Sequence, residues 1–279
     1  ILIKNVINAY LGTPLETDYY YLVLTRRRQM EFTDFYKESR QYHENTYGNV
    51  KWTTYPKFDK KMQENKLASI SCKETLSPVH ISSVEKKFMV SRNEFFIAVA
   101  LLAIAISTNK NDVHVSWVYN GRDDLASKSS VGLLCRELSA GLRLRDKTNL
   151  RDIFTEIHNQ VRDGIKYSCY PYMATIPQDE EGDIACVLYQ RDIREADDFD
   201  GMNVNKVEIA HNNAAAQSVL DIQILDDEDG LQYVFDYAAG RYECETMTEF
   251  QNLFRSVIAA IVNNANTDGY DFGQLKKDV

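Results

Sequence analysis

Apolar and polar residues follow two different periods along the chain, and the change of period outlines the expected helices and strands. Between residues 150 and 166, apolar side chains recur every three or four positions, which predicts an amphipathic helix. Between residues 113 and 119 they partly alternate with polar ones, which predicts a half-buried strand. The same two periods predict helices over 1–11, 77–88, 91–107 and 246–263, one or two helices within 17–47, and strands over 184–189, 206–209, 219–225 and 231–237.

The helix expected over 91–107 carries the clearest start signal. Ser91 and Glu94 form an S-x-x-E pattern directly before an apolar run, which is the arrangement of a capping box. The residues that follow are apolar on nearly every side. A helix of this kind belongs inside a hydrophobic core.

The order of these elements indicates the fold class. Strands alternate with helices, and a hairpin and a last helix follow, so we expect an α/β fold in which helices cover a mixed β-sheet. Residues 52–73 are polar and lack a clear period, and we interpret them as a crossover or linker; the tail after residue 263 is also polar. Because the chain opens at helical spacing without an initiator methionine, we expect it to be part of a longer polypeptide.

The charge of the chain argues against nucleic acid as a partner. Its 279 residues carry a formal charge of -9 at pH 7, and no basic stripe is available to neutralise phosphates. The one tight basic run, residues 26–28, is expected on a solvent-exposed helix face. The longest apolar run, 95–106, is shorter than the about 20 residues that a membrane-spanning helix needs, so we expect no membrane partner either.

The cysteines favour a reducing compartment. They are odd in number, lie far apart and form no C-x-x-C pair, which predicts neither a disulfide framework nor a zinc site. Free thiols are typical of cytoplasmic proteins, and we expect that location. The five residues are Cys72, Cys135, Cys169, Cys186 and Cys244.

The sequence contains no recognised catalytic motif that would identify a reaction type. The patterns of P-loops, dinucleotide-binding turns, zinc proteases and serine hydrolases do not occur. We expect His114 to be a half-exposed structural histidine on a strand and His158 to face solvent from a helix. His211 lies in a predicted loop and is a candidate for substrate contact. The sequence therefore predicts no catalytic residue and no metal site.

Several stretches of the chain follow one another in an order that is typical of a known family. The first is a predicted strand that ends in Asn120-Gly121-Arg122. The later ones are Val131-Gly132-Leu133-Leu134-Cys135-Arg136-Glu137-Leu138, Arg143-Leu144, Tyr167-Ser168-Cys169-Tyr170-Pro171-Tyr172, and Asp221-Ile222-Gln223-Ile224 followed by Phe235-Asp236-Tyr237. In this order they resemble the C-terminal half of a condensation domain of nonribosomal peptide synthetases. The first resembles the x-G-R that ends a hydrophobic strand in that family, and the others resemble its I-G-x-F-V-N-T-L, its closing strand, its H-Q-D-Y-P-F and its D-L-x-L strand with hairpin.

The resemblance implies a chloramphenicol acetyltransferase-like lobe and a chain in two parts. Residues 1–73 would be a helical remnant of the N-terminal lobe plus a crossover linker, and residues 74–279 the C-terminal lobe. Gly12-Thr13-Pro14-Leu15 resembles the turn that follows the family's H-H-x-x-x-D-G motif, which we expect upstream of residue 1. The resemblance places eight candidates in the wall or floor loop of a substrate tunnel, the arginine after the glycine tying the loop down: Asn120, Gly121, Arg122, Gly132, Cys135, Arg136, Tyr167 and Tyr170.

Two stretches depart from the family pattern. Arg136-Glu137 stands where the family has Asn-Thr, and Tyr167-Ser168-Cys169 stands where it has His-Gln-Asp. Either change could alter the tunnel wall or mark a divergent branch of the family.

The resemblance also implies a function. Condensation domains join a donor acyl or peptidyl thioester to an acceptor aminoacyl thioester by forming an amide, and orientation and electrostatics supply most of the catalysis. Both substrates arrive on the phosphopantetheine arms of carrier proteins, so no cofactor is expected to bind directly. The expected partners are carrier proteins, neighbouring synthetase domains and the missing N-terminal lobe. This part would supply one tunnel wall, the floor loop and the latch, and we expect it to be inactive alone.

Other functions on the same fold stay open at this point. An epimerisation or heterocyclisation domain shares the fold and differs in motifs outside this chain. A stand-alone acyltransferase that uses coenzyme A is a second enzyme class, and a catalytically dead docking or interaction module is a non-enzyme class. An unrelated α/β protein with the same spacing is the remaining alternative.

Overall fold

The computed structural model describes residues 2–15, 17–59, 66–74, 78–171, 184–191, 218–227 and 230–279. Three features singled out in the sequence lie outside these ranges, namely the strand expected over 206–209, the loop residue His211, and Tyr172 at the end of its motif.

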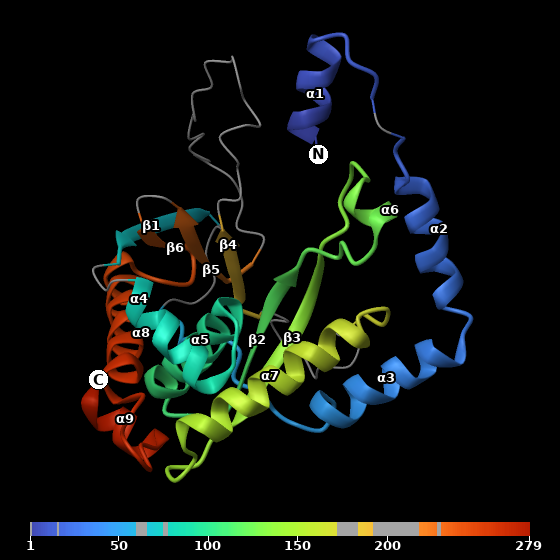
Figure 1. Ribbon diagram of the computed structural model, residues 1–279. Helices are drawn as coiled ribbons and strands as arrows, with labels where there is room; N and C mark the ends of the chain where they lie inside the picture. The colour runs from blue at the N-terminus through green and yellow to red at the C-terminus, as the bar shows by residue number, and fades with distance from the viewer. Residues whose placement is uncertain are drawn as a thin grey trace.

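The described strands form one mixed sheet in the order β1-β6-β5-β4-β2-β3 (Figure 1). β2 pairs in parallel with β4, and β4 with β5, while the β2–β3, β5–β6 and β1–β6 pairs are antiparallel. This is the α/β class with a mixed sheet that the sequence predicts. The strands are β1 (Leu67–Lys73), β2 (Asp112–Tyr119), β3 (Arg136–Arg143), β4 (Cys186–Arg191), β5 (Leu220–Asp227) and β6 (Gly230–Ala238).

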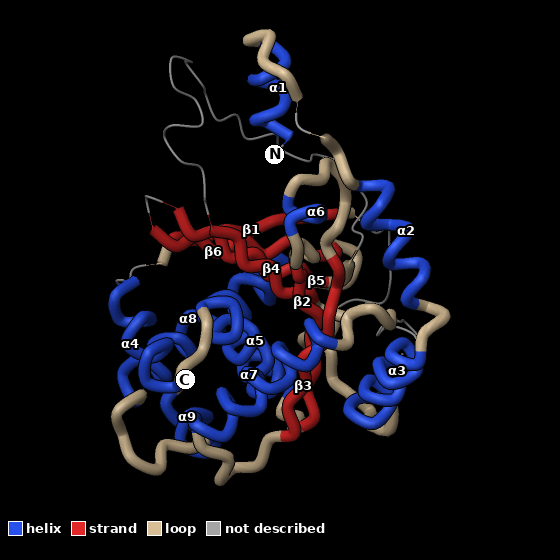
Figure 2. Tube along the Cα trace, turned by 45° about the vertical axis from the view of Figure 1, so that its right-hand side comes forward, coloured by secondary structure: helices blue, strands red, loops and turns tan. Residues whose placement is uncertain are grey.

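Helices cover the sheet unevenly. α4, α5, α7, α8 and α9 gather on one side of it, while α2 and α3 lie beside the β2–β3 pair, away from α8 and α9 (Figures 1 and 2). The helices are α1 (Leu2–Tyr10), α2 (Tyr20–Met30), α3 (Asp34–Tyr47), α4 (Pro78–Phe88), α5 (Arg92–Thr108), α6 (Leu125–Lys128), α7 (Leu150–Lys166), α8 (Cys244–Asn264) and α9 (Phe272–Asp278).

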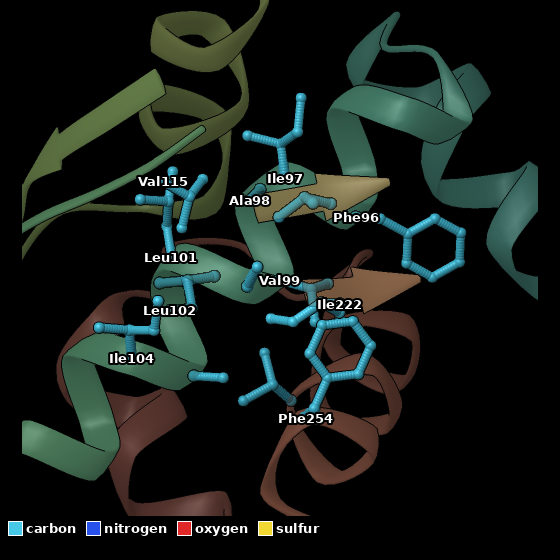
Figure 3. Packing of buried hydrophobic residues seen from close by; sticks show 14 of the residues in the cluster. Phe96, Ile97, Ala98, Val99, Leu101, Leu102, Ile104, Val115, Ile222 and Phe254 are labelled. Atoms are coloured by element: carbon cyan, nitrogen blue, oxygen red, sulfur yellow. The ribbon is translucent and has the colours of Figure 1, made fainter. Parts of the chain in front are cut away.

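α5 forms the centre of the hydrophobic core (Figure 3). Every residue from 94 to 105 is buried, and α5 contacts β2, β4, α7 and α8. The capping box at its start has both bonds, because Ser91 Oγ accepts from the Glu94 backbone N–H and the Glu94 carboxylate accepts from the Ser91 backbone N–H. The prediction of a buried, capped helix is therefore confirmed.

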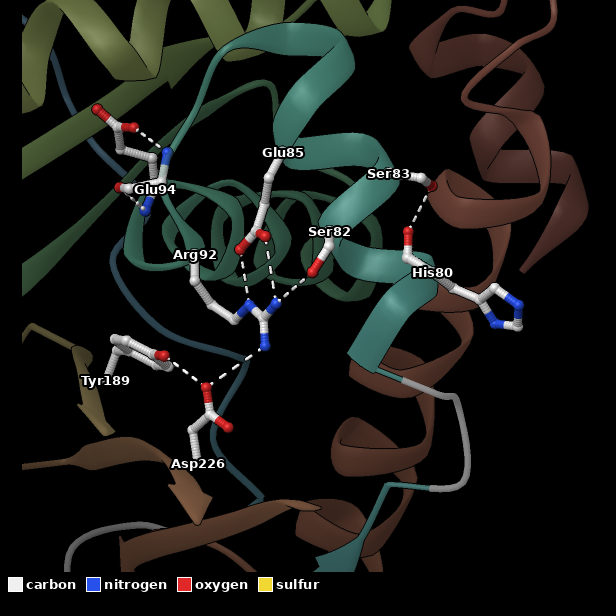
Figure 4. A network of polar contacts seen from close by, with 9 residues as sticks. His80, Ser82, Ser83, Glu85, Arg92, Glu94, Tyr189 and Asp226 are labelled. Atoms are coloured by element: carbon white, nitrogen blue, oxygen red, sulfur yellow. Dashed lines mark hydrogen bonds and ion pairs between the residues drawn. The ribbon is translucent and has the colours of Figure 1, made fainter. Parts of the chain in front are cut away.

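A charged network fastens the start of α5 to the sheet (Figure 4). Arg92 donates to both carboxylate oxygens of Glu85, at 2.6 and 3.2 Å, and to Asp226 at 3.4 Å. Tyr189 donates to the same Asp226 oxygen at 2.6 Å. The network joins α4 and α5 to β4 and β5 through charge-assisted bonds, which are stronger than neutral ones.

Two segments that looked irregular in the sequence are regular in the structure. The end of the segment interpreted as a linker is β1, an edge strand that pairs with β6, so the stretch 67–73 belongs to the sheet. Its side chains do alternate between less exposed Ala68, Ile70 and Cys72 and more exposed Ser69, Ser71 and Lys73, but the alternation covers only a short stretch after a polar one, which hid the period. The polar tail contains α9, which is short and is held by the buried side chains of Phe272 and Leu275. The assignment of 1–73 and 74–279 to two lobes remains a prediction.

His114 is fully buried, so the expectation of a half-exposed side chain is wrong. The rings of Tyr47 and Trp52 cover this face of β2, with centroids 5.6 and 5.9 Å from the imidazole. The Nε2 atom shares a hydrogen bond of 3.0 Å with Ser139 Oγ. Burial lowers the pKa of His114 from 6.5 to about 3.

We expect the free energy of unfolding to fall as the pH drops below about 6.5. In the unfolded chain His114 is protonated below that pH, whereas in the folded protein it stays neutral down to about pH 3. The slope from this group approaches about 1.4 kcal/mol per pH unit within that window and vanishes above it. Urea unfolding of wild type and His114→Gln between about pH 7 and pH 5 measures the difference. Phe32→Ala, at an exposed residue without a titratable group, provides the control and should keep the wild-type slope. Equal slopes for wild type and His114→Gln would contradict the assignment.

Candidate functional site

The second residue of the loop between β2 and β3 occupies a position that strongly favours glycine. Gly121 has a φ of +65°, a conformation that other residues adopt at a cost. A Cβ atom there would lie 2.1 Å from the Leu134 carbonyl oxygen and 2.9 Å from Arg27 Nη2. The two ends of the loop therefore meet at a position with no room for a side chain.

Arg122 holds the rest of the loop in shape. Its guanidinium donates to the carbonyl oxygens of Ser127, Ser130 and Gly132, the last two at 2.8 and 3.1 Å. Its backbone N–H donates to the Asn120 side chain at 3.0 Å. The arginine thus ties the loop down, as the resemblance implies, and the position of that loop in a tunnel stays a prediction.

Helix α2 closes over this loop from the N-terminal part of the chain. Arg27 Nη2 donates to the carbonyl oxygens of Gly121 and Leu134, both at 3.0 Å. The Tyr20 hydroxyl donates to the Leu133 carbonyl at 3.4 Å. The expectation that the whole basic run 26–28 is solvated is therefore wrong for Arg27, which is partly buried and bonded to the loop.

Two neighbouring cavities, of about 290 and 480 Å³, lie between α2, the loop and the start of β3. Four residues line both of them: Arg27, Met30, Asp123 and Arg136. The smaller cavity extends to the end of α7 and the larger one along α2. Further lining residues are Glu31, Phe35, Ile165, Lys166, Ser168 and Cys169 in the smaller cavity and Val23, Arg26, Gln29, Thr33, Gly121, Asp124 and Ser127 in the larger one.

The shared wall is cationic and partly buried. Arg136 Nη1 donates to the Ser168 hydroxyl. Burial lowers the pKa of both Arg27 and Arg136, and the positive charge of Arg136 lowers the pKa of Arg27 further. Both guanidiniums still remain protonated at neutral pH. No histidine is among the described residues that line either cavity. The guanidiniums of Arg27 and Arg136 can donate further hydrogen bonds, so this wall is suited to binding and orienting a substrate.

The structure brings together only part of the predicted set. Gly121 and Arg136 line the cavities, and Arg122 shapes the loop beside them. Gly132 lies against the Tyr20 ring, and Asn120 and Cys135 are exposed, with Cys135 absent from the described lining.

The two tyrosines of the later motif pack against α3 instead of lining the cavities. The Tyr167 ring stacks on Tyr42 at 4.8 Å, and its hydroxyl donates to Glu38 at 2.8 Å. The Tyr170 ring meets Tyr36 at 5.2 Å. Ser168, between them, is the residue of this motif that contacts Arg136.

Two findings concern other kinds of site. Within the described ranges no single helix is long and apolar enough to cross a membrane. Two consecutive helices, His80–Phe88 and Arg92–Thr108, together have the length and composition of a membrane span, but the chain bends by 96° between them. No group of three or more His, Cys, Asp or Glu side chains among the described residues is placed to hold a metal ion.

His158, on α7, has a side chain that is 47% exposed, and its Nδ1 atom lies 2.9 Å from the Glu94 carboxylate.

The chain matches a family model and several solved structures. The model of the condensation domain matches residues 1–273. The condensation domain of the monacolin K polyketide synthase superposes with a TM-score of 0.76 at 12% identity, over 97% of this chain and 66% of that one. The epimerization domain from the third module of tyrocidine synthetase B does so with a TM-score of 0.71 at 14% identity, over 92% and 63%.

A four-domain nonribosomal peptide synthetase, AB3403, solved with AMP and glycine, superposes with a TM-score of 0.68 at 12% identity, over 82% of this chain and 19% of that one. The chain thus spans less than two thirds of the length of each of these solved chains. The TM-scores show a shared fold, and at these identities the likeness extends to the fold alone. No curated protein matches this chain.

Proposed function

Because this chain belongs to the condensation-domain family, we propose that it forms part of an enzyme that joins two carrier-bound substrates through an amide bond. The acceptor amine attacks the carbonyl carbon of the donor thioester, a C–N bond forms, the C–S bond breaks, and the proton lost by the amine goes to the leaving thiolate. The observation that carries this proposal is the family match over residues 1–273.

We place the substrates at the wall formed by the β2–β3 loop and β3. Gly121 and Arg136 border the cavities there, and Arg122 fixes the loop that would form the floor. A rigid wall of this kind favours the reaction by orienting the two substrates, a contribution that does not require a proton-transfer group on this wall. The phosphopantetheine arms of carrier proteins would bring the substrates, and the four-domain synthetase with the same fold supports such a setting.

The test uses the complete polypeptide with a donor carrier loaded with an acetyl group and a panel of aminoacyl-loaded acceptor carriers. We expect the mass of at least one acceptor carrier to rise by that of an acetyl group, measured by intact-protein mass spectrometry. The proposal is wrong if every acceptor keeps its mass while the loaded donor stays available. Residues 1–279 on their own are expected to transfer nothing, because they contain no adjacent pair of histidines.

Epimerisation is the second candidate, because the tyrocidine synthetase epimerization domain has the same fold. An epimerase would exchange the Cα hydrogen of a carrier-bound aminoacyl or peptidyl group with solvent without forming an amide. The same assay in D₂O separates the two functions, since deuterium uptake without acyl transfer indicates epimerisation and acyl transfer indicates condensation.

A further inference from the structure

The two stretches that depart from the family pattern meet in space. Arg136, which stands in the place of an asparagine, donates to the hydroxyl of Ser168, which stands in the place of a glutamine. Cys169, the next changed residue, lines the same cavity as Arg136. The two departures therefore alter one site together, and they add a guanidinium to its wall.

This guanidinium and that of Arg27 have unused hydrogen-bonding capacity. An arginine has five N–H donors. Arg136 uses one donor group, on Ser168, and Arg27 uses Nη2 on two backbone carbonyls. Neither forms an ion pair with a carboxylate among the described residues, and burying a guanidinium without a counter-ion is unfavourable.

The remaining charges at the cavities leave a net positive wall. Lys166 and Glu31 line the smaller cavity with opposite signs, and Arg26 and Asp124 line the larger one as an ion pair of 3.5 Å. Asp123 lies near both arginines without a described bond to either, and its charge acts against the fall in their pKa values. An anion that enters the site therefore meets two guanidiniums and competes with one carboxylate.

We propose that Arg27 and Arg136 bind an oxyanion carried by a substrate, as the part of the site that selects acidic over neutral groups. Guanidinium groups match the planar geometry of carboxylates and the oxygens of phosphates. The shared chemistry allows two sources, a carboxylate on the donor or acceptor and the phosphate of the pantetheine arm. That the oxyanion belongs to a substrate rests on the proposed function, whereas the binding of an oxyanion between these arginines does not.

The first experiment measures binding to the complete polypeptide by isothermal titration calorimetry at constant ionic strength. The probes are succinate, its neutral diamide and inorganic phosphate. We expect one of the two anions to bind and the diamide to bind at least about 10-fold more weakly. Arg136→Gln should weaken anion binding by about 10- to 100-fold.

Two further variants separate a binding role from a structural one. Asp123→Asn should strengthen anion binding by about 2- to 5-fold, because it removes a competing negative charge, and a disturbed fold would not give that gain. Arg143 lies at the other end of β3, is exposed and lines neither cavity, so Arg143→Gln should leave binding unchanged. Binding of neither anion, or equal loss in Arg136→Gln and Arg143→Gln, would overturn the proposal.

The source of the oxyanion follows from two comparisons in the transfer assay. A preference for aspartyl over asparaginyl or glutamyl over glutaminyl acceptors, or for succinyl over butanoyl donors, identifies a carboxylate. A preference for thioesters of phosphopantetheine over those of pantetheine identifies the phosphate. Both preferences should disappear in Arg136→Gln. Anion binding without any transfer would refute the proposed function alone, and transfer without any of these preferences would refute the substrate oxyanion alone.

Discussion

Replacing Gly121 by alanine should lower the free energy of unfolding by about 3 kcal/mol and remove most of the transfer activity of the complete polypeptide. The left-handed backbone at φ +65° costs a side-chain-bearing residue about 1–2 kcal/mol. The new Cβ would also lie 2.1 Å from a backbone oxygen of Leu134, so the loop must shift, at a cost of about 1–3 kcal/mol. That shift breaks the two bonds from Arg27 and moves the cavity wall.

Gly164 offers a matched control for this change. It lies within α7, and a Cβ there meets no atom within 4 Å. Gly164→Ala should therefore stabilise the protein by up to about 1 kcal/mol, because alanine favours a helix interior. Urea unfolding and the transfer assay check both variants. Equal behaviour of the two glycine variants would show that the loop is not sterically constrained.

Phe96→Ala is expected to lower the free energy of unfolding by about 3–5 kcal/mol, which is the range for truncating a large buried aromatic side chain. Phe96 is fully buried on α5, and its ring meets those of Tyr233, Tyr189 and Phe254 with centroids 5.9, 6.0 and 6.5 Å away. These neighbours belong to β6, β4 and α8, so the cavity would open where three elements meet on α5.

The control is Phe32, whose side chain is 89% exposed. Phe32→Ala should change the free energy of unfolding by no more than about 0.5 kcal/mol. Both variants can be compared by urea denaturation at neutral pH. A loss below about 1 kcal/mol for Phe96→Ala would contradict this prediction and mean that the side chains around α5 repack into the gap.

The fold could be predicted where a single period runs through a whole element. The stripe of apolar residues over 150–166 predicts α7 with the same first and last residue, and the S-x-x-E pattern predicts the start of α5. β1 and α9 were missed, because each is only 7 residues long and adjoins a polar stretch of the chain.

The site could be predicted in part, because some of its contacts are local and others span the chain. Arg122 bonds to carbonyls within ten residues of itself, so a strand-ending motif captures its role. Arg27 bonds to Gly121, 94 residues away, and no local pattern shows that contact. The burial of His114 has the same cause, because the ring of Trp52 that covers it comes from the segment interpreted as a linker.

The pairing of β1 with β6 has a consequence for the order in which the protein can fold during synthesis. Ser69 on β1 lies opposite Asp236 on β6, 167 residues later in the chain. A ribosome adding about 5–20 residues per second needs about 10–30 s to reach that partner. Until then the backbone donors and acceptors of β1 are unpaired, which in an apolar strand would invite aggregation. Ser69, Ser71 and Lys73 make the more exposed face of β1 polar, which suits the strand to remain solvated until the last hairpin forms.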